Sequence, residues 1–435
     1  MHRTRHSPRF RAVFVALLVV VAAVTYLWLQ GTFESPDRIA QVHALQGSPS
    51  VGATTLDHSP FRITPAFAVW AADRLNAFGL VESASGVVTY SPSDGTWRQG
   101  AAPPFDTALA GAIGVSTDKE MIVIGVECSP DSPVAAVEED GLACEPGTLA
   151  GARYDPSGDT WVNLSFPVAL ASAFGKGHSP TVGEAIGWTG EAAIFRIGEG
   201  YSSYSPGTGE WSRVAPVPQL EKMCVAGSQL VAVARQVGTD YTPQSDEPVP
   251  PLQTLNAVNA MFFDFGSGGW KPGPSAMLQQ EASRSLVVCS PDGVYVVPAH
   301  TLQEVQFLSV ASQTWTSLAG VPVDLAQQPN PEGLTNPPQP KNVFSLLDRG
   351  AWTGQHLVLF SPGFSANDIP QSDAFKGGDF VMPAYAAAFE PKSSTWQSAS
   401  PGPVDKKTEV WRDGYALILE GDSTGYPALI TYRPV

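Results

Sequence analysis

The sequence predicts an all-β fold built from a repeated unit of four strands, and two patterns in the chain indicate it. The first is a turn that occurs six times, in which an aromatic or large apolar residue is followed seven positions later by a tryptophan. The second is a shorter turn upstream of most of these copies, as in "GWTGEAAIFRIG" from Gly187 and "AWTGQHLVLF" from Ala351. A fixed spacing within copies and variable intervals between them mark a repeated supersecondary unit.

Each copy of the longer turn is typical of a hairpin. An apolar strand ends on the aromatic residue, turn-forming residues reverse the chain, and the next strand carries the tryptophan. Together with the upstream hairpin this predicts four strands per unit, which are named a to d in chain order. The six pairs are Tyr90 and Trp97, Tyr154 and Trp161, Tyr204 and Trp211, Phe263 and Trp270, Leu308 and Trp315, and Phe389 and Trp396.

The longer turn resembles the kelch repeat, in which strand b ends on two glycines and strands c and d carry a tyrosine and a tryptophan. Five of the six copies match at the aromatic residue, and the glycine pair is mostly reduced to one, as at Gly125, Gly198 and Gly421. The resemblance covers roughly residues 63 to 435 and is to a divergent, bacterial-type member similar to the central domain of galactose oxidase. It implies a β-propeller, in which each four-stranded sheet is one blade around a central channel.

Counting the units predicts seven blades, with six blades as the alternative. Six units carry the aromatic-to-tryptophan turn, and a seventh set of strands begins at Glu409 and ends at Val435 without a fourth strand. A propeller must close its ring to hide the sheet edges. We therefore expect a segment between Val42 and Ile63 to supply the missing strand.

The tryptophans are expected to be part of the scaffold. Besides the six in the repeat turns, Trp70, Trp188, Trp352 and Trp411 fall at the end of strand a in their units, and Trp28 lies in the N-terminal apolar segment. A sugar-stacking surface is the functional alternative. Large aromatic side chains dominate core energetics, so we expect those at repeat positions to fill the space between neighbouring blades.

The first thirty residues differ from the rest of the chain. Residues 1–11 carry four arginines and no acid, and residues 12–29 form an unbroken apolar run. Eighteen helical residues nearly cross a hydrocarbon core about 30 Å thick, and the basic flank should stay in the cytoplasm. A cleaved signal peptide, with secretion, is the alternative, but no small-x-small site follows Leu29.

The expected organisation follows from this segment. Residues 1–11 form a cytoplasmic basic flank, 12–30 a transmembrane signal anchor, 31–62 a linker with a candidate ring-closing strand, and 63–435 the propeller outside the cytoplasm. Four cysteines are compatible with that oxidising side. Cys128 and Cys144 bracket one loop, and Cys224 and Cys289 occupy matching points of strand a in units four and five, so we expect the disulfides 128–144 and 224–289. A metal site or reactive thiol is the alternative, which no CxxC motif supports.

The chain is acidic. Its formal net charge is -16, and without the four arginines of the flank 21 basic residues face 41 acidic ones, which gives -20 for the exported part. A surface of this charge repels nucleic acid, which is therefore excluded as a partner. Solubility is its ordinary role, and attraction for cations or basic partners is the functional alternative.

The long loops predict where a ligand binds. In a propeller the b-to-c loops and d-to-a linkers emerge on one face, and every long insertion belongs to this set: 126–150, 236–256, 362–382 and the linker 321–343. Long loops on a rigid scaffold commonly carry recognition, and aromatic and carboxylate side chains suit sugars, peptides or a Ca²⁺ ion. The candidate ligand-binding residues are Asp240, Tyr241, Phe364, Asp368, Asp373, Phe375, Asp379, Phe380, His178 and His300.

The expected function is a binding or interaction module for a protein or carbohydrate outside the cytoplasm, with no catalytic residue and no cofactor except Ca²⁺ in the acidic loops. A hydrolase, lyase or oxidase that uses the same face is the alternative. "FRIT" at Phe61 to Thr64 resembles a sialidase motif at three of four residues, and three convergent arginines including Arg62 would favour that enzyme. The copper site implied by galactose oxidase does not carry over, because it needs a cysteine crosslinked to tyrosine and the cysteines here are expected to be paired.

Overall fold

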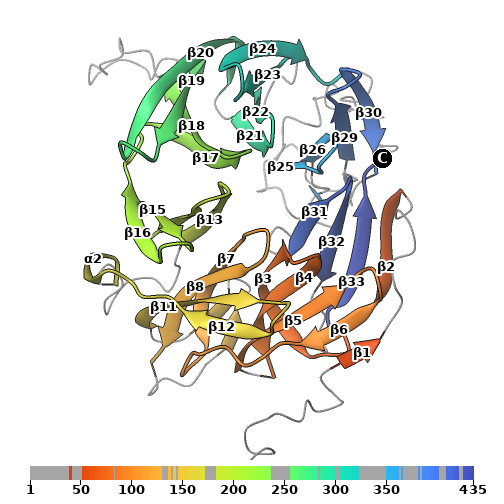
Figure 1. Cartoon of the computed structure of the whole chain (residues 1–435). Coiled ribbons are helices and arrows are strands. Elements are labelled where there is room, and N and C mark those ends of the chain that lie inside the picture. Colours follow the sequence, from red (N-terminus) through yellow and green to blue (C-terminus); the bar gives the residue numbers. More distant parts are fainter. Residues whose placement is uncertain are drawn as a thin grey trace, which may run out of the picture.

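The computed structural model describes residues 39–41, 51–82, 84–129, 136–138, 141–143, 146–171, 183–236, 255–282, 285–298, 304–322, 349–361, 364–365, 381–382, 385–400, 408–420 and 425–435. Within these ranges the main strands form seven antiparallel sheets arranged in a ring (Figure 1). Six of these sheets have four strands and one has five. The prediction of seven four-stranded blades is confirmed, and the six-bladed alternative is wrong.

The first four blades follow the expected order of strands a to d. Blade one contains β3 (Ile63–Ala71), β4 (Arg74–Val81), β5 (Ala84–Ser91) and β6 (Thr96–Gln99). Blade two contains β7 (Leu109–Ser116), β8 (Met121–Cys128), β11 (Pro146–Asp155) and β12 (Thr160–Asn163), followed by the short helix α2 (Val168–Ala171). Blade three contains β13 (Gly183–Trp188), β14 (Ala193–Ile197), β15 (Gly200–Ser205) and β16 (Glu210–Val214), and blade four contains β17 (Leu220–Ala226), β18 (Gln229–Gln236), β19 (Leu255–Asp264) and β20 (Gly269–Ala282).

The last three blades include the closure of the ring. Blade five contains β21 (Ser285–Ser290), β22 (Gly293–Pro298), β23 (Glu304–Ser309) and β24 (Thr314–Ala319), and blade six contains β25 (Arg349–Trp352), β26 (Leu357–Ser361), β29 (Tyr385–Glu390) and β30 (Thr395–Ala399). Blade seven contains β31 (Glu409–Arg412), β32 (Tyr415–Glu420), β33 (Ala428–Arg433) and, as its outer strand, the N-terminal β2 (Gly52–His58).

The apolar core lies between neighbouring blades. Strand b carries a nearly continuous apolar run that is buried on both sides, as in β8 and β22, because each blade is covered by the next. One cluster joins Val231 and Val258 of blade four to Val294 and Leu308 of blade five. Burial of this kind contributes about 25 cal/mol per Å² of apolar surface, so each blade depends on its neighbours for stability.

Strand β2 closes the ring as the sequence predicts. It pairs antiparallel with β33, with Ala53 opposite Tyr432 and Thr54 opposite Thr431. The closing strand thus lies inside the expected window of residues 42 to 63. A further strand, β1 (Ile39–Gln41), pairs with β6 as a fifth strand of blade one, and this strand was not predicted.

The repeat tryptophans tie each blade to the preceding one. In five of the six, the indole Nε1–H donates to a backbone carbonyl that lies four residues after the tryptophan of the preceding blade. These bonds are Trp161 to Ala101 at 2.9 Å, Trp211 to Ser165 at 3.0 Å, Trp270 to Ala215 at 2.7 Å, Trp315 to Pro274 at 2.9 Å and Trp396 to Ala319 at 2.9 Å. In blade seven, whose fourth strand carries no tryptophan, the Tyr432 hydroxyl donates to the Ser400 carbonyl, four residues after Trp396. These bonds connect neighbouring blades through their repeat tryptophans.

The exception is at the interface between blades seven and one. The Trp97 Nε1 is buried and has no hydrogen-bond partner among the described residues. In blade one Trp97 of strand d lies opposite Tyr90 of strand c, and in blade seven Ala53 lies opposite Tyr432 in the same way. The acceptor for the Trp97 indole would therefore be the carbonyl four residues after Ala53, which is that of residue 57. The pairing of β2 with β33 shifts register between residues 55 and 57, and such a bulge displaces the local carbonyls.

Other contacts hold blades seven and one together. The Arg412 guanidinium carbon lies 4.7 Å from the centre of the Trp70 ring, and Arg412 also forms an ion pair with Asp73 at 2.9 Å. Leu56 of β2 packs against the cluster that contains Leu417 and residues of blade one. Packing and a cation–π contact therefore replace the indole hydrogen bond at this interface.

A disulfide joins the innermost strands of blades four and five. Cys224 of β17 is bonded to Cys289 of β21, with a Cα–Cα distance of 6.4 Å, which confirms the expected pairing. Cys128 is also disulfide-bonded, and its expected partner Cys144 lies outside the described residues. The expected transmembrane segment, 12–30, likewise lies outside them, and no helix in the part that is described is long and apolar enough to cross a membrane.

Candidate functional site

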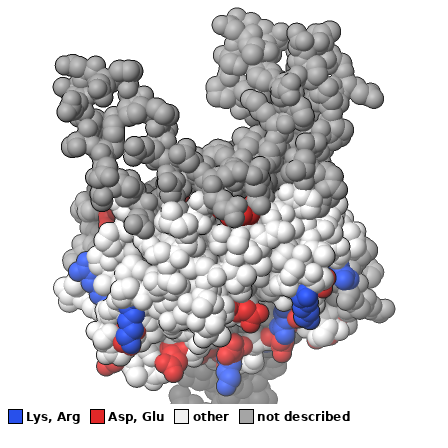
Figure 2. Space-filling model, turned by 90° about the horizontal axis from the view of Figure 1, so that it is seen from above, with Lys and Arg blue, Asp and Glu red and all other residues white. Residues whose placement is uncertain are grey.

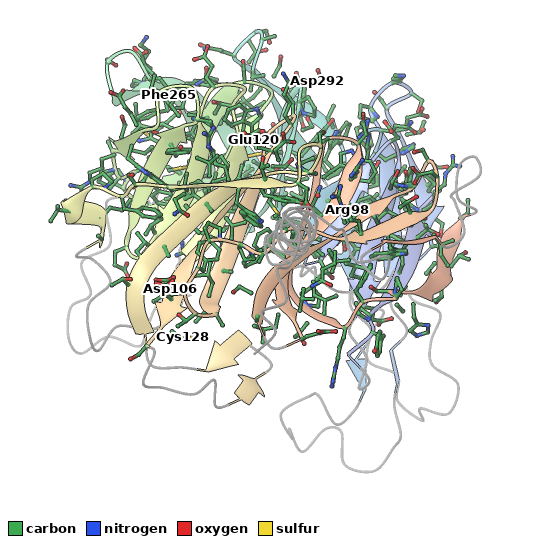
Figure 3. The ribbon with its side chains drawn as sticks, turned by 60° about the horizontal axis from the view of Figure 1, so that its bottom comes forward. Arg98, Asp106, Glu120, Cys128, Phe265 and Asp292 are labelled. Atoms are coloured by element: carbon green, nitrogen blue, oxygen red, sulfur yellow. A yellow bond between two sulfur atoms is a disulfide. The ribbon has the colours of Figure 1, made fainter. Side chains whose placement is uncertain are left out.

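The ring has two faces of different construction. Figure 3 shows Glu120, Asp292 and Phe265 toward one end of the ring and Asp106 and Cys128 toward the other. The first three follow or belong to a-to-b and c-to-d turns, whereas Asp106 belongs to a d-to-a linker and Cys128 ends a strand b. We call the first end the turn face and the second the loop face. The separation of the two sets of connections follows the expected pattern.

The turn face is made of short connections that are rigidly hydrogen-bonded. In blade two the Thr117 Oγ1 accepts hydrogen bonds from the backbone N–H groups of Lys119 and Glu120, at 3.2 and 2.8 Å. Thr189 and Thr353 form the same arrangement in blades three and six. Hydroxyl groups used in this way stabilise turns. Most of the coloured charged side chains in Figure 2 gather along the lower rim, which corresponds to this face.

A cleft of about 400 Å³ opens on the turn face where blades one, two and three meet. Its lining residues are Ala72, Thr117, Asp118, Lys119, Glu120, Asp155, Ser157, Trp188 and Pro206. Beneath them Arg153 forms an ion pair with Glu120 at 3.3 Å and donates to the Pro206 carbonyl at 3.3 Å. Sequence reasoning missed this cleft, because its walls come from ordinary turn residues of three repeats and no motif marks them.

The loop face carries additional small hairpins. The connection between strands b and c of blade two contains β9 (Ala136–Glu138) paired with β10 (Gly141–Ala143). The corresponding connection of blade six contains β27 (Phe364–Ser365) paired with β28 (Val381–Met382), with Phe364 opposite Met382. Of the ten candidate ligand-binding residues only Phe364 is among the described ones, on β27. The other nine lie outside the described residues, namely Asp240, Tyr241, Asp368, Asp373, Phe375, Asp379, Phe380, His178 and His300.

Charged side chains lie beside the central channel at the loop face, near the start of strand a in blades three, four, six and seven. Glu184 of blade three forms an ion pair with Lys222 of blade four, and Arg349 of blade six forms one with Glu409 of blade seven. The second pair is nearly enclosed, with side-chain exposures of 11% and 3%. Glu221 accepts a hydrogen bond from the Ser285 backbone N–H of blade five at 3.3 Å. These charges form contacts between neighbouring blades.

Potential metal ligands, the sialidase-like arginine and groups with shifted pKa values are the features of the described residues that bear on the expectations from the sequence. No group of three or more histidine, cysteine, aspartate or glutamate side chains within the described ranges could hold a metal ion. Arg62 is exposed and lies against Gly425, rather than in a pocket with two other arginines. Burial raises the pKa of the core tyrosines Tyr90 and Tyr295 to about 12. Hydrogen bonds with Lys271 and Ser267 lower the pKa of Asp264, at the end of β19, to about 2.

Comparison with known proteins adds little beyond this geometry. No protein-family model matches the sequence, and no curated protein is similar to it in sequence. Among solved structures, oligogalacturonate lyase from Vibrio parahaemolyticus is similar over 90% of this chain and 97% of its own, at 8% identity and a TM-score of 0.47. The β-propeller domain of the Trilobed protease from Pyrococcus furiosus, which has an open velcro topology, is similar over 86% of this chain and 95% of its own, at 6% identity and a TM-score of 0.44.

A third solved structure, TolB from Acinetobacter baumannii, is similar over 59% of this chain and 55% of its own, at 12% identity and a TM-score of 0.32. Likeness at these values carries no argument about function. The propeller architecture of this chain follows from its own strand pairing, and the kelch resemblance is supported by its repeat motifs alone.

Proposed function

We propose that the protein is a membrane-anchored, extracytoplasmic kelch-like propeller that binds a ligand on its loop face. The hairpins β9–β10 and β27–β28 carry this proposal, because both extend b-to-c connections on the loop face. The a-to-b turns on the opposite face are short and bind their own backbone groups. Elaborated loops on a rigid scaffold are a common location of recognition sites.

The ligand is proposed to be a protein or a carbohydrate. Aromatic and carboxylate residues of the insertions, among them Tyr241, Phe375 and Asp379, suit either class, and a Ca²⁺ ion bound by the acidic loops would support them. The net charge of -16 disfavours a nucleic acid. A propeller enzyme that uses the same face is the alternative. The ion pairs at the channel mouth favour binding over catalysis, because they leave Lys222 and Arg349 engaged with neighbouring blades.

The test compares the two faces. The full chain in detergent micelles is screened on a glycan array and in a pulldown from an extracytoplasmic protein fraction. Deletion of residues 365–379 should abolish the interaction found, and Ser93→Tyr, in the c-to-d turn of blade one on the turn face, should leave it unchanged. Binding that survives the deletion, or that Ser93→Tyr removes, would contradict the loop face as the ligand site.

A further inference from the structure

The N-terminal part of the chain runs along the outer edge of two neighbouring blades. Strand β1 covers the edge of blade one, with Ala40 opposite Trp97, and β2 forms the edge of blade seven, with Ala53 opposite Tyr432. The two strands belong to one stretch of chain, residues 39–58. Figure 1 shows β1 and β2 at the lower right of the ring, across from β20 of blade four at the upper left.

The chain between the expected anchor and β1 is short. The anchor ends at residue 30 and β1 begins at Ile39, so eight residues, 31–38, connect them. A fully extended chain spans at most about 3.3 to 3.6 Å per residue, which limits this connection to about 29 Å. The edge of blades seven and one must therefore stay within that distance of the end of the anchor.

We propose that the edge formed by β1, β6 and β2 is the surface of the propeller that faces the lipid bilayer. This inference rests on the proposed membrane anchor and adds the orientation of the domain to it. The edge of blade four points away from the bilayer, and the axis of the ring lies roughly parallel to the membrane. The loop face then opens sideways, where a ligand in the surrounding space or on a neighbouring protein reaches it without passing the bilayer.

The charge of the propeller indicates that the short connection to the anchor, and not adhesion of one face to the lipid, orients the ring. The exported part carries 21 basic and 41 acidic residues, a formal charge of -20 that anionic headgroups repel. On the turn face Arg412 is paired with Asp73 at 2.9 Å and with Asp413 at 3.2 Å, so this guanidinium is already neutralised by neighbouring carboxylates. The pairing of β1 with β6 therefore determines which side of the ring is nearest to the membrane.

The test measures energy transfer from single sites on the ring to the membrane. The full chain is reconstituted in lipid vesicles whose headgroups carry an acceptor dye, and a donor dye is attached under non-reducing conditions to Thr55→Cys or to Met277→Cys. Thr55 is exposed on β2, and Met277, on β20, is 67% exposed. We expect several-fold stronger transfer from position 55. Ala53→Cys supplies a second position on the near edge if the first variant does not fold.

A longer tether gives an independent control. Insertion of twenty glycine and serine residues between residues 30 and 31 should remove most of the difference between positions 55 and 277, because the ring can then turn freely. Equal transfer from both positions of the vesicle-bound original chain would overturn the proposed orientation while the anchor stands. A chain that does not associate with vesicles would refute the anchor, and the orientation would be refuted with it.

Discussion

At the scale of single residues, the tryptophans have a more specific role than filling space. Five of the six repeat indoles donate a hydrogen bond to a carbonyl at a constant offset in the preceding repeat, so the same residue both fills the interface and sets the relative position of two blades. The sequence could predict the strands and the burial of these residues. It could not predict the acceptor, because a carbonyl has no side-chain signature and the bond joins residues 41 to 77 positions apart.

The Trp97 indole of blade one, which has no hydrogen-bond partner among the described residues, is a reference against which the contribution of the indole hydrogen bond can be measured. Trp161→Phe removes a bonded N–H, and Trp97→Phe removes one that has no acceptor. Because a net hydrogen bond contributes about 1 kcal/mol, we expect Trp161→Phe to lower the free energy of unfolding by about 1 kcal/mol more than Trp97→Phe does. Urea denaturation of both variants measures the difference. Equal losses would show that these indoles act through packing alone.

His356 makes the stability of the chain depend on pH. Its Nδ1 is buried and has no hydrogen-bond partner within the described part of the chain, and burial is the main cause that lowers its pKa from the usual 6.5. The unfolded chain therefore binds this proton more readily, so the stabilising contribution is present above about pH 6.5 and is lost as the pH falls through the folded pKa. We expect the original chain to lose more stability between pH 7.5 and pH 5 than His356→Gln. Parallel pH profiles of the two proteins would exclude this contribution.

At the scale of elements, the inner strands are joined by specific cross-links. The matching positions of the two cysteines in strand a made the disulfide between blades four and five predictable. The ion pairs of Glu184 with Lys222 and of Arg349 with Glu409 were not predictable, because charged residues at strand starts are also common on solvated surfaces. Strand β1 was missed as well, since three residues are too few to show an alternating pattern.

Removal of the Cys224–Cys289 disulfide should be costly. The bond closes a loop with a sequence separation of 65, and the loss of unfolded-state entropy for a loop of that length is worth about 4 kcal/mol. We expect the double variant Cys224→Ser and Cys289→Ser to be destabilised by about this amount in non-reducing urea denaturation. Dithiothreitol should lower the free energy of unfolding of this variant further only by reducing the disulfide of the remaining cysteines. A variant as stable as the original chain would mean that packing alone holds blades four and five together.

At the scale of the whole molecule, counting the strands of each repeat predicted more of the architecture than any sequence motif did. Three strands at the C-terminus required a fourth from the N-terminus, and the closed ring supplies it as β2. The location of the long loops also followed from strand register. The cleft on the turn face could not be predicted in this way, because residues of three blades, Ala72, Glu120 and Pro206 among them, meet there only in the folded ring.

Ring closure can be tested by truncation. A chain that begins at residue 59 lacks β2 and leaves β33 unpaired, and it also loses the packing of Leu56 against the cluster of blades seven and one. We expect this chain to lose its cooperative unfolding transition in circular dichroism and to aggregate, because an exposed strand edge pairs with other chains. A chain that begins at residue 42 keeps β2 and should unfold cooperatively. Similar transitions for both chains would show that the ring is stable without its closing strand.

The pairing of β2 with β33 also determines when the protein can finish folding. Thr431 donates from its hydroxyl to the Thr54 carbonyl at 3.3 Å, across 377 positions of sequence. At synthesis rates of about 5 to 20 residues per second, β2 waits about 20 to 75 seconds for its partner strand to be made. Strand β2, near the N-terminus, thus depends on the last strand of the chain. Any helper protein that shields β2 during this interval would act before the chain is complete, and ring closure would release it.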